Sequence, residues 1–331
     1  MTHAKMYPRH LLRAQDFTRE GLDDLFRKVR ETKQLLATSE GTEELRHRLP
    51  GKVMHAFFAE ESTRTRFSFC TAAARLGMTP IWCENAKFSS MGKAGETLED
   101  TVECLLGYGP DILVLRHPDD DAAERAAFIS DQKYGGIPVI NAGSGKKHHP
   151  TQTRLDLFTV DELLGGIDGK KFAIGADVFY SRVARSFAYS LCAFKRIEIV
   201  FVSPNELAPP TELLAHLKAH GVSYTLTTDL MSALREADVT LWGRLQVERV
   251  EDVKLRQDLI KQCAAFQIGP NQAAVMPKHA LLLHPQPISE AHEITELVKA
   301  QCPNYKVPQQ SANGLPVRMV DIWERLRVQP I

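Results

Sequence analysis

Short apolar runs alternate with helical patterns along the whole chain, and this alternation restricts the possible folds more than any other feature. The runs read as strands because each is short, apolar and bounded by turn residues. They are Val53–Phe58, Pro80–Cys83, Ile112–Leu115, Val139–Asn141, Phe172–Ile174, Ile197–Val202, Tyr224–Thr227, Val239–Trp242 and Leu281–Leu283. The helical patterns between the early runs are Arg64–Leu76, Thr97–Leu106 and Ala122–Ile129, after a first amphipathic helix at Asp16–Leu36. This order predicts the α/β class, with doubly wound parallel sheets covered by helices on both faces.

The length of the chain, 331 residues, predicts two such domains, because a domain typically has about 150 residues. A linking helix at Thr151–Leu164 separates the two series of strands, so the predicted domains are residues 1–150 and 151–331. A last helical pattern, Val317–Leu326, follows the Gly314-Leu315-Pro316 turn. This terminal helix could pack back on the first domain.

Composition excludes several classes of function. Lys plus Arg and Asp plus Glu both number 41, and such a balance argues against binding nucleic acid or anionic membranes. No run approaches the roughly 18 apolar residues of a membrane span, and the first residues lack an apolar signal core. The six cysteines include no CxxC pair, which favours scattered reduced thiols over a zinc site or a disulfide framework. We therefore predict a cytoplasmic protein.

A hydroxyl-rich segment with two arginines, Ser62-Thr63-Arg64-Thr65-Arg66, directly follows a strand and opens a helix. The free N–H groups at a helix N-terminus bind anions, hydroxyls add donors, and a guanidinium suits phosphate. The alternative is that Ser62 or Thr63 only caps the helix. Capping does not require arginines, so the segment favours a phosphate site.

Further polar segments follow the other strands, where ligands gather in such sheets. Arg116-His117-Pro118 ends one strand, and His148-His149-Pro150-Thr151-Gln152 precedes the linking helix. A surface cation, a capping residue or a metal ligand are the alternatives for these two segments. No second ligand at suitable spacing supports a metal site. The sharper hypothesis is that a histidine donates to an oxyanion that develops during a reaction.

Three more segments lie in the second half, at Tyr180-Ser181-Arg182, Arg244-Leu245-Gln246-Val247-Glu248-Arg249 and His284-Pro285-Gln286-Pro287. The first lies where a dinucleotide fingerprint would be, but it lacks the glycine spacing, and an arginine there suits a carboxylate. The prolines of the last indicate a stiff loop in which a cis bond is expected. Ordinary loops remain the alternative for the second and third.

Together the six segments resemble those of the aspartate and ornithine carbamoyltransferase family, in the same order, and the aspartate branch more closely. Gly95-Glu96-Thr97 resembles the segment after the lid loop of that family. Pro285 stands where the ornithine branch has a cysteine. The resemblance covers the chain from about Phe57 to the terminal helix. It implies transfer of a carbamoyl group from carbamoyl phosphate to the amine of L-aspartate, a step of pyrimidine biosynthesis.

The resemblance also implies a role for each residue, without a metal or an organic cofactor. Arg64, Thr65, Arg116 and His149 would be catalytic. Carbamoyl phosphate would be held by Ser62, Thr63, Arg64, Thr65, Arg116, His149, Gln152, Gln286 and Pro287. Aspartate would be held by Arg182, Arg244 and Gln246. The first domain would bind carbamoyl phosphate and the second the amino acid, in a homotrimer whose neighbouring subunit contributes Ser90 and Lys93. A regulatory or dihydroorotase partner is also conceivable from the family.

The chain departs from the family at three places that leave alternatives open. Ala94 replaces the lid lysine, with Lys93 one residue earlier. Gln286 stands where leucine is usual, and Ile288 where arginine is usual. The alternatives are a carbamoyltransferase for a different amino acid, and a catalytically silent paralogue that acts as a binding or scaffold partner.

Overall fold

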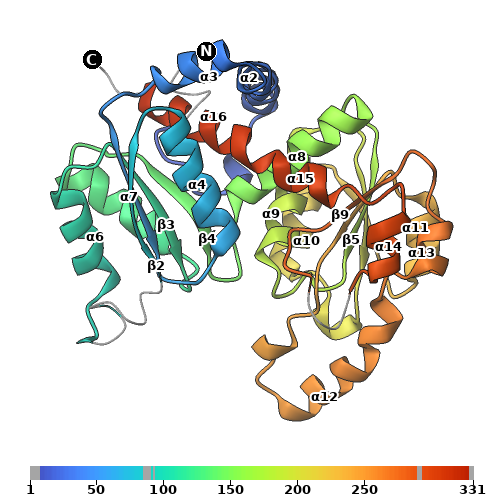
Figure 1. The fold of residues 1–331 in the computed structure, drawn as a ribbon. Coiled ribbons are helices and arrows are strands. Elements are labelled where there is room, and N and C mark those ends of the chain that lie inside the picture. The colour runs from blue at the N-terminus through green and yellow to red at the C-terminus, as the bar shows by residue number, and fades with distance from the viewer. Residues whose placement is uncertain (1–7, 85–90, 92–93, 289–292, 328–331) are drawn as a thin grey trace. The chain divides into compact units, whose positions relative to one another are not determined.

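A computed structural model of the protein describes residues 8–84, 91, 94–288 and 293–327. It divides into two compact units (Figure 1). The first contains Met1–Leu155 and Asn313–Ile331, and the second contains Asp156–Ala312. The α/β prediction is confirmed, since each unit has one parallel sheet with helices packed against it. The predicted lid residues Ser90 and Lys93 lie outside the described residues.

The sheet of the first unit has the strand order β2-β1-β3-β4, and all its pairs are parallel. The strands are β1 (Val53–Phe58), β2 (Thr79–Glu84), β3 (Ile112–His117) and β4 (Val139–Ser144). Neighbouring residues of a strand face opposite sides, so Phe58 packs in one core cluster and Phe57 in another. Helix α4 (Thr63–Arg75) covers the first side, and α6 (Leu98–Gly107) and α7 (Ala122–Lys133) cover the second. Burial on both sides explains why these strands are almost continuously apolar.

Further helices of the first unit come from the beginning and the end of the chain. A 3-10 turn, η1 (Ala14–Asp16), precedes α2 (Arg19–Leu36) and α3 (Ser39–Arg46). Thr18 and Thr38 cap α2 and α3, and each threonine side chain accepts from a backbone N–H three residues later. The last helix, α16 (Gly314–Arg327), packs against α2 and α4 (Figure 1).

The second unit has a five-stranded parallel sheet in the order β7-β6-β5-β8-β9. Its strands are β5 (Lys171–Gly175), β6 (Glu198–Val202), β7 (Ser223–Thr227), β8 (Val239–Trp242) and β9 (Leu281–Leu283). Its helices are α9 (Arg182–Ser190), α10 (Thr211–Ala219), α11 (Leu230–Glu236), α12 (Val253–Gln262), α13 (Pro270–Ala274), α14 (Glu296–Gln301) and α15 (Val307–Ala312). Short 3-10 turns are η3 (Leu191–Ala193), η4 (Asn205–Leu207), η5 (Val247–Arg249) and η6 (Cys263–Phe266). Trp242 is fully buried at the end of β8, and its indole N–H donates to the Phe266 carbonyl at 3.0 Å.

The predicted strands agree with the observed ones to within a few residues, and Val53–Phe58, Val239–Trp242 and Leu281–Leu283 agree at both ends. The predicted Gly314-Leu315-Pro316 turn is wrong, because α16 already begins at Gly314. Pro316 lies in the first turn of that helix, where the missing N–H of proline costs no hydrogen bond. No described helix is long and apolar enough to cross a membrane.

Buried ion pairs hold α16 to the first unit. Arg154 lies near the start of α8 (Pro150–Leu164), which continues from the first unit into the second. Its guanidinium contacts Asp321 at 2.6 Å and Glu324 at 3.2 Å, and all three side chains are at most 4% exposed. Lys28 of α2 adds a contact to Glu324 at 3.1 Å. The cluster thus joins the linking helix, the first long helix and the last helix.

Removing one member of this cluster should strongly destabilise the protein. Arg154→Ala leaves the buried Asp321 without its guanidinium, and breaking such a pair costs about 3–5 kcal/mol. Arg27→Ala is the control, because Arg27 is 57% exposed and pairs with Glu31 on the surface of α2. Such a surface pair contributes about 0–1 kcal/mol. Urea unfolding of both variants measures the difference, and equal stabilities would contradict the role of the cluster.

Candidate functional site

The predicted phosphate segment lies at the carboxyl end of the first sheet. Ser62 is the N-cap residue of α4, but its side chain makes no capping hydrogen bond. Its hydroxyl instead donates to the Thr65 hydroxyl at 2.9 Å. The Ser62 side chain therefore does not cap the helix, and the first turn of α4 contains no acidic residue to repel an anion.

The two arginines of this segment have different surroundings. Arg66 is buried, and its guanidinium stacks over the ring of Trp82 at 4.5 Å. Arg64 is exposed, and no other residue in the described part of the chain pairs with its guanidinium. Arg64 is thus available to an anion at the start of α4, whereas Arg66 has a packing role against the edge strand β2.

Arg116 and His149 meet beside this segment. Parallel pairing places Arg116 of β3 next to Phe58, the last residue of β1, and the Ala59 N–H donates to the Arg116 carbonyl at 2.8 Å. The Arg116 guanidinium lies 3.5 Å from His149 Nε2 and 3.2 Å from Glu60. Because arginine can only donate, Nε2 of His149 is the acceptor in this contact. Nδ1 lies 3.4 Å from the Thr151 hydroxyl.

Gln152 lies in the first turn of α8, where its N–H donates to the His149 carbonyl at 3.1 Å. The predicted residues of the first unit therefore lie at the carboxyl ends of three neighbouring strands: after β1, in the last residues of β3 and after β4. A cation, a neutral imidazole and a hydroxyl-rich helix start are the groups that bind a phosphate ester and polarise a carbonyl.

In the second unit a buried carboxylate organises the predicted amino-acid site. Asp177 follows β5 and is fully buried. It accepts from the N–H of Tyr180 at 2.8 Å and from the N–H of Gln246 at 3.1 Å. One acid thus fixes both the loop that leads to Arg182, at the start of α9, and the loop after β8 that carries Arg244 and Gln246. Burial raises the pKa of Asp177 to about 6, against the opposing effect of these two hydrogen bonds.

Arg244 has a partner within the chain. Both of its terminal nitrogens contact Glu248, one of them at 3.1 Å, and both side chains are partly exposed. The residue that was predicted to bind a substrate carboxylate therefore pairs with a carboxylate of the η5 turn. A dicarboxylate ligand would have to replace that contact.

The last predicted segment forms a tight loop after β9. His284 is buried, its N–H donates to Gln310 Oε1 at 2.9 Å, and its Nδ1 accepts from the Gln286 N–H at 2.8 Å. The expected cis bond is present between Gln286 and Pro287. The Ser311 hydroxyl donates to Gln286 Oε1 at 3.1 Å, so α15 holds the side chain of Gln286.

Three residues of these loops were not predicted from the sequence: Glu60, Asp177 and Glu248. Asp177 had a usable signal, since a carboxylate directly after a buried strand lies where ligands gather in such sheets. Glu60 and Glu248 had none, because their contacts depend on how the loops fold.

Comparison with known proteins agrees with this geometry. Residues 9–162 match the model of the aspartate/ornithine carbamoyltransferase carbamoyl-P binding domain, and residues 168–320 match that of the Asp/Orn binding domain. The chain is 38% identical over 311 residues to a chloroplastic aspartate carbamoyltransferase of Oryza sativa subsp. japonica, covering 93% of this chain and 82% of the relative. It is 36% identical over 313 residues to the aspartate carbamoyltransferase catalytic subunit of Methanocaldococcus jannaschii, covering 94% and 95%.

Among solved structures, aspartate transcarbamoylase from Trypanosoma cruzi in complex with N-(phosphonacetyl)-L-aspartic acid superposes with a TM-score of 0.85. The two chains are 29% identical, and the match covers 97% of each. Because both family domains, in order, account for nearly the whole chain, this protein belongs to the aspartate/ornithine carbamoyltransferase family.

Proposed function

We propose that the protein transfers the carbamoyl group of carbamoyl phosphate to the amine of L-aspartate, giving N-carbamoyl-L-aspartate and phosphate. The observations that carry this proposal are the Arg116–His149 contact and the Ser62–Thr65 helix start, which lie at the carboxyl ends of neighbouring parallel strands. The amine attacks the carbonyl carbon, the bond from that carbon to the phosphate oxygen breaks, and the leaving phosphate takes the electron pair and can accept the proton that the amine nitrogen loses. Both the carbonyl oxygen and the phosphate therefore need donors around them.

The residues of the first unit supply these donors. Ser62, Thr63, Arg64 and Thr65 bind the phosphate with hydroxyls, backbone N–H groups and one guanidinium. Thr65, Arg116 and His149 polarise the carbonyl oxygen. His149 can donate only from a nitrogen that carries a proton, so to polarise the carbonyl oxygen Nε2 exchanges its contact with Arg116 for that oxygen and carries the proton. Gln152 and the backbone carbonyls of Gln286 and Pro287 orient the carbamoyl NH2 group.

The residues of the second unit select the acceptor. Arg182 and Arg244 bind the two carboxylates of aspartate, since a guanidinium pairs with a carboxylate through two parallel hydrogen bonds. Gln246 adds an amide contact. Asp177 acts as a positioning residue, because its carboxylate accepts from the backbone of both loops, at Tyr180 and at Gln246. The reaction needs no metal or organic cofactor, since alignment of two substrates and stabilisation of the leaving phosphate suffice.

The proposal extends to pathway, location and assembly. The proposed product is the carbamoyl amino acid of pyrimidine biosynthesis. We also propose a cytoplasmic location, whereas the rice relative is named chloroplastic. By family resemblance the chain forms a homotrimer in which a neighbouring subunit contributes Ser90 and Lys93, and a regulatory or dihydroorotase partner joins it. Sedimentation of the purified chain tests the trimer.

Labelled carbamoyl phosphate and a panel of amino acids test the reaction directly. We expect label in N-carbamoyl-aspartate, and more than tenfold weaker turnover in Arg64→Ala, because a hydrogen bond to a charged group contributes about 1.5–3 kcal/mol. Arg75→Ala is the matched control, since this exposed arginine lies at the other end of the same helix. Transfer to ornithine but not to aspartate would replace the proposed acceptor.

Asp177→Asn should raise the KM for aspartate by about tenfold and leave that for carbamoyl phosphate unchanged. An amide can accept only one of the two N–H groups, so one loop loses its anchor, at a cost of about 1 kcal/mol or more. Asp168→Asn is the control, because Asp168 also accepts a backbone N–H, from Lys195 at 2.7 Å, in the loop before β5. Equal effects on both KM values would exclude a specific positioning role.

The same variant has a pH signature. The pKa of Asp177 is about 6 in the folded protein, above its ordinary value of 3.8, so as pH rises between these values the unfolded chain ionises first. This ionisation of the unfolded chain lowers wild-type stability by on the order of 3 kcal/mol across the interval. Asp177→Asn lacks this loss. The difference in free energy of unfolding between wild type and Asp177→Asn should therefore become smaller from pH 4 to pH 6. Denaturant unfolding at several pH values measures it.

Ala94→Lys should raise the rate of aspartate carbamoylation. A lysine at this exposed position restores the family cation near the transferring phosphate, and one preorganised donor of this kind contributes about 100- to 1,000-fold in rate. Ala94→Gln is the control, because it has similar length and no charge. Steady-state assays at saturating carbamoyl phosphate compare the three proteins. A faster wild type would assign the role to Lys93, and inactivity of all three would favour the silent paralogue.

A further inference from the structure

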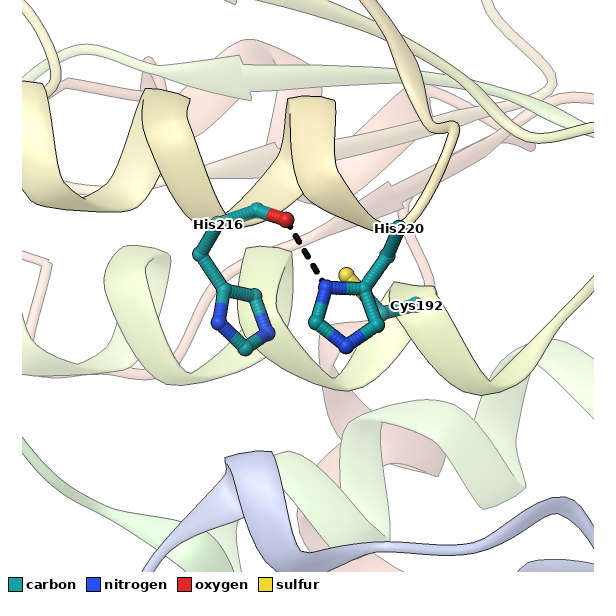
Figure 2. Close-up of side chains that lie close together, drawn as sticks. All are labelled: Cys192, His216 and His220. Carbon is teal, nitrogen blue, oxygen red and sulfur yellow. Dashed lines mark hydrogen bonds between the residues drawn. The ribbon is translucent and has the colours of Figure 1, made fainter.

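Helices α9 and α10 of the second unit are joined by a ladder of side chains. Arg185 pairs with Glu212 at 2.6 Å. One turn further along both helices, the rings of Tyr189 and His216 pack edge to face with centroids 4.9 Å apart. The next step brings Cys192, in the η3 turn that ends α9, to His216 and His220 of α10 (Figure 2). Only this last step consists of metal-ligating groups.

The three groups have the spacing of a metal site. One ligand atom from each of Cys192, His216 and His220 lies within 4.8 Å of the other two. Two nitrogen or sulfur ligands on one tetrahedral zinc ion are roughly 3.3–3.7 Å apart, from bond lengths of about 2.0–2.3 Å. The set therefore needs to contract by about 1 Å, which side-chain rotation can supply at this partly exposed surface.

The hydrogen bonding of His220 suits a metal ligand. His220 Nδ1 lies 2.8 Å from the His216 carbonyl oxygen, which can only accept, so Nδ1 is the donor and Nε2 is the nitrogen left to a metal ion (Figure 2). Such an outer hydrogen bond commonly orients a metal-bound histidine. The His216 and His220 rings stack with centroids 4.1 Å apart. Partial burial, and then the neighbouring His220, lower the pKa of His216.

We propose that Cys192, His216 and His220 bind a divalent transition-metal ion of the zinc class. One thiolate and two imidazoles suit such an ion, whereas magnesium and calcium prefer oxygen ligands. No fourth His, Cys, Asp or Glu joins the group among the residues described, so water completes the coordination at the exposed side of His220. Binding converts the Cys192 thiol to a thiolate and releases its proton to solvent.

The bound ion would tie the end of α9 to α10, beyond the Arg185–Glu212 pair. The cysteine spacing favoured scattered thiols over a zinc site, because the cysteines form no CxxC pair, and the proposed group contains no such pair either. His216 and His220 are four residues apart on one helix, which places them on the same face, but their cysteine lies 24 residues earlier in the chain. Burial raises the pKa of the Cys192 thiol to about 11, so the ion must displace a tightly held proton.

Zinc titration of the chelator-treated full chain tests the proposal. We expect stoichiometric binding of Zn²⁺, and more than tenfold weaker binding in Cys192→Ser, His216→Gln and His220→Gln. His47→Gln is a matched control, because His47 also ends a helix and its Nδ1 also contacts the carbonyl four residues earlier, at 2.9 Å. Wild-type affinity in His220→Gln would overturn the proposal. This variant changes an exposed side chain, so its fold should persist, and its metal-free melting curve verifies that.

Cobalt provides a second readout that does not depend on affinity. Co²⁺ bound through Cys192 should show a thiolate-to-cobalt charge-transfer band, absent in Cys192→Ser and retained in Cys302→Ser, which changes another partly buried thiol of the same unit. A cobalt spectrum without that band, or one unchanged in Cys192→Ser, would rule out the thiolate ligand and with it the site. Neither measurement requires catalytic activity, so the result is independent of the proposed transferase reaction.

Discussion

Parallel strand pairing is the constraint on which both halves of the candidate site depend. In a parallel sheet every strand ends at the same edge, so the loops that follow the strands are brought together whatever their separation in sequence. Pairing of Phe58 with Arg116 places the helix start after β1 beside the guanidinium of β3. Pairing of Gly175 with Trp242 places Asp177 within reach of the loop that carries Gln246. The chemistry of each unit follows from register.

Buried charged side chains then fix helices and loops whose position strand register does not determine. The two units use these side chains differently. In the first, the guanidinium of Arg154 contacts two carboxylates of α16 inside the core, which holds a distant helix in place. In the second, two backbone N–H groups satisfy Asp177, and Arg249 adds a smaller electrostatic effect. Its raised pKa records that hydrogen bonds only partly offset the loss of solvation. The first arrangement stabilises the fold, whereas the second organises loops.

The sequence predicted what depends on local pattern and failed where tertiary packing decides. Apolar periodicity located the strands, and their ends located Ser62, Arg116 and His149, because side chains after strands share an edge. The pattern could not separate Arg64 from Arg66, which differ only in that Trp82 of the neighbouring strand covers the second. Nor could the pattern predict the ion pair of Glu248 with Arg244 or the position of Cys192 beside His216, since both depend on how elements pack.

Two arginines assigned to substrate are each paired with a glutamate of the chain, Arg116 with Glu60 and Arg244 with Glu248. Such pairs keep a guanidinium ordered before an anion arrives, which reduces the entropy lost on binding. They also have to be broken or shared. Arg244 and Glu248 are 36% and 49% exposed, so their pair contributes at most about 1 kcal/mol and yields readily to a substrate carboxylate. Arg116 is only 11% exposed, so its contact with Glu60 is screened less and is better suited to persist while His149 exchanges partners. Arg244 is thus the more adaptable of the two, and Arg116 the more rigid.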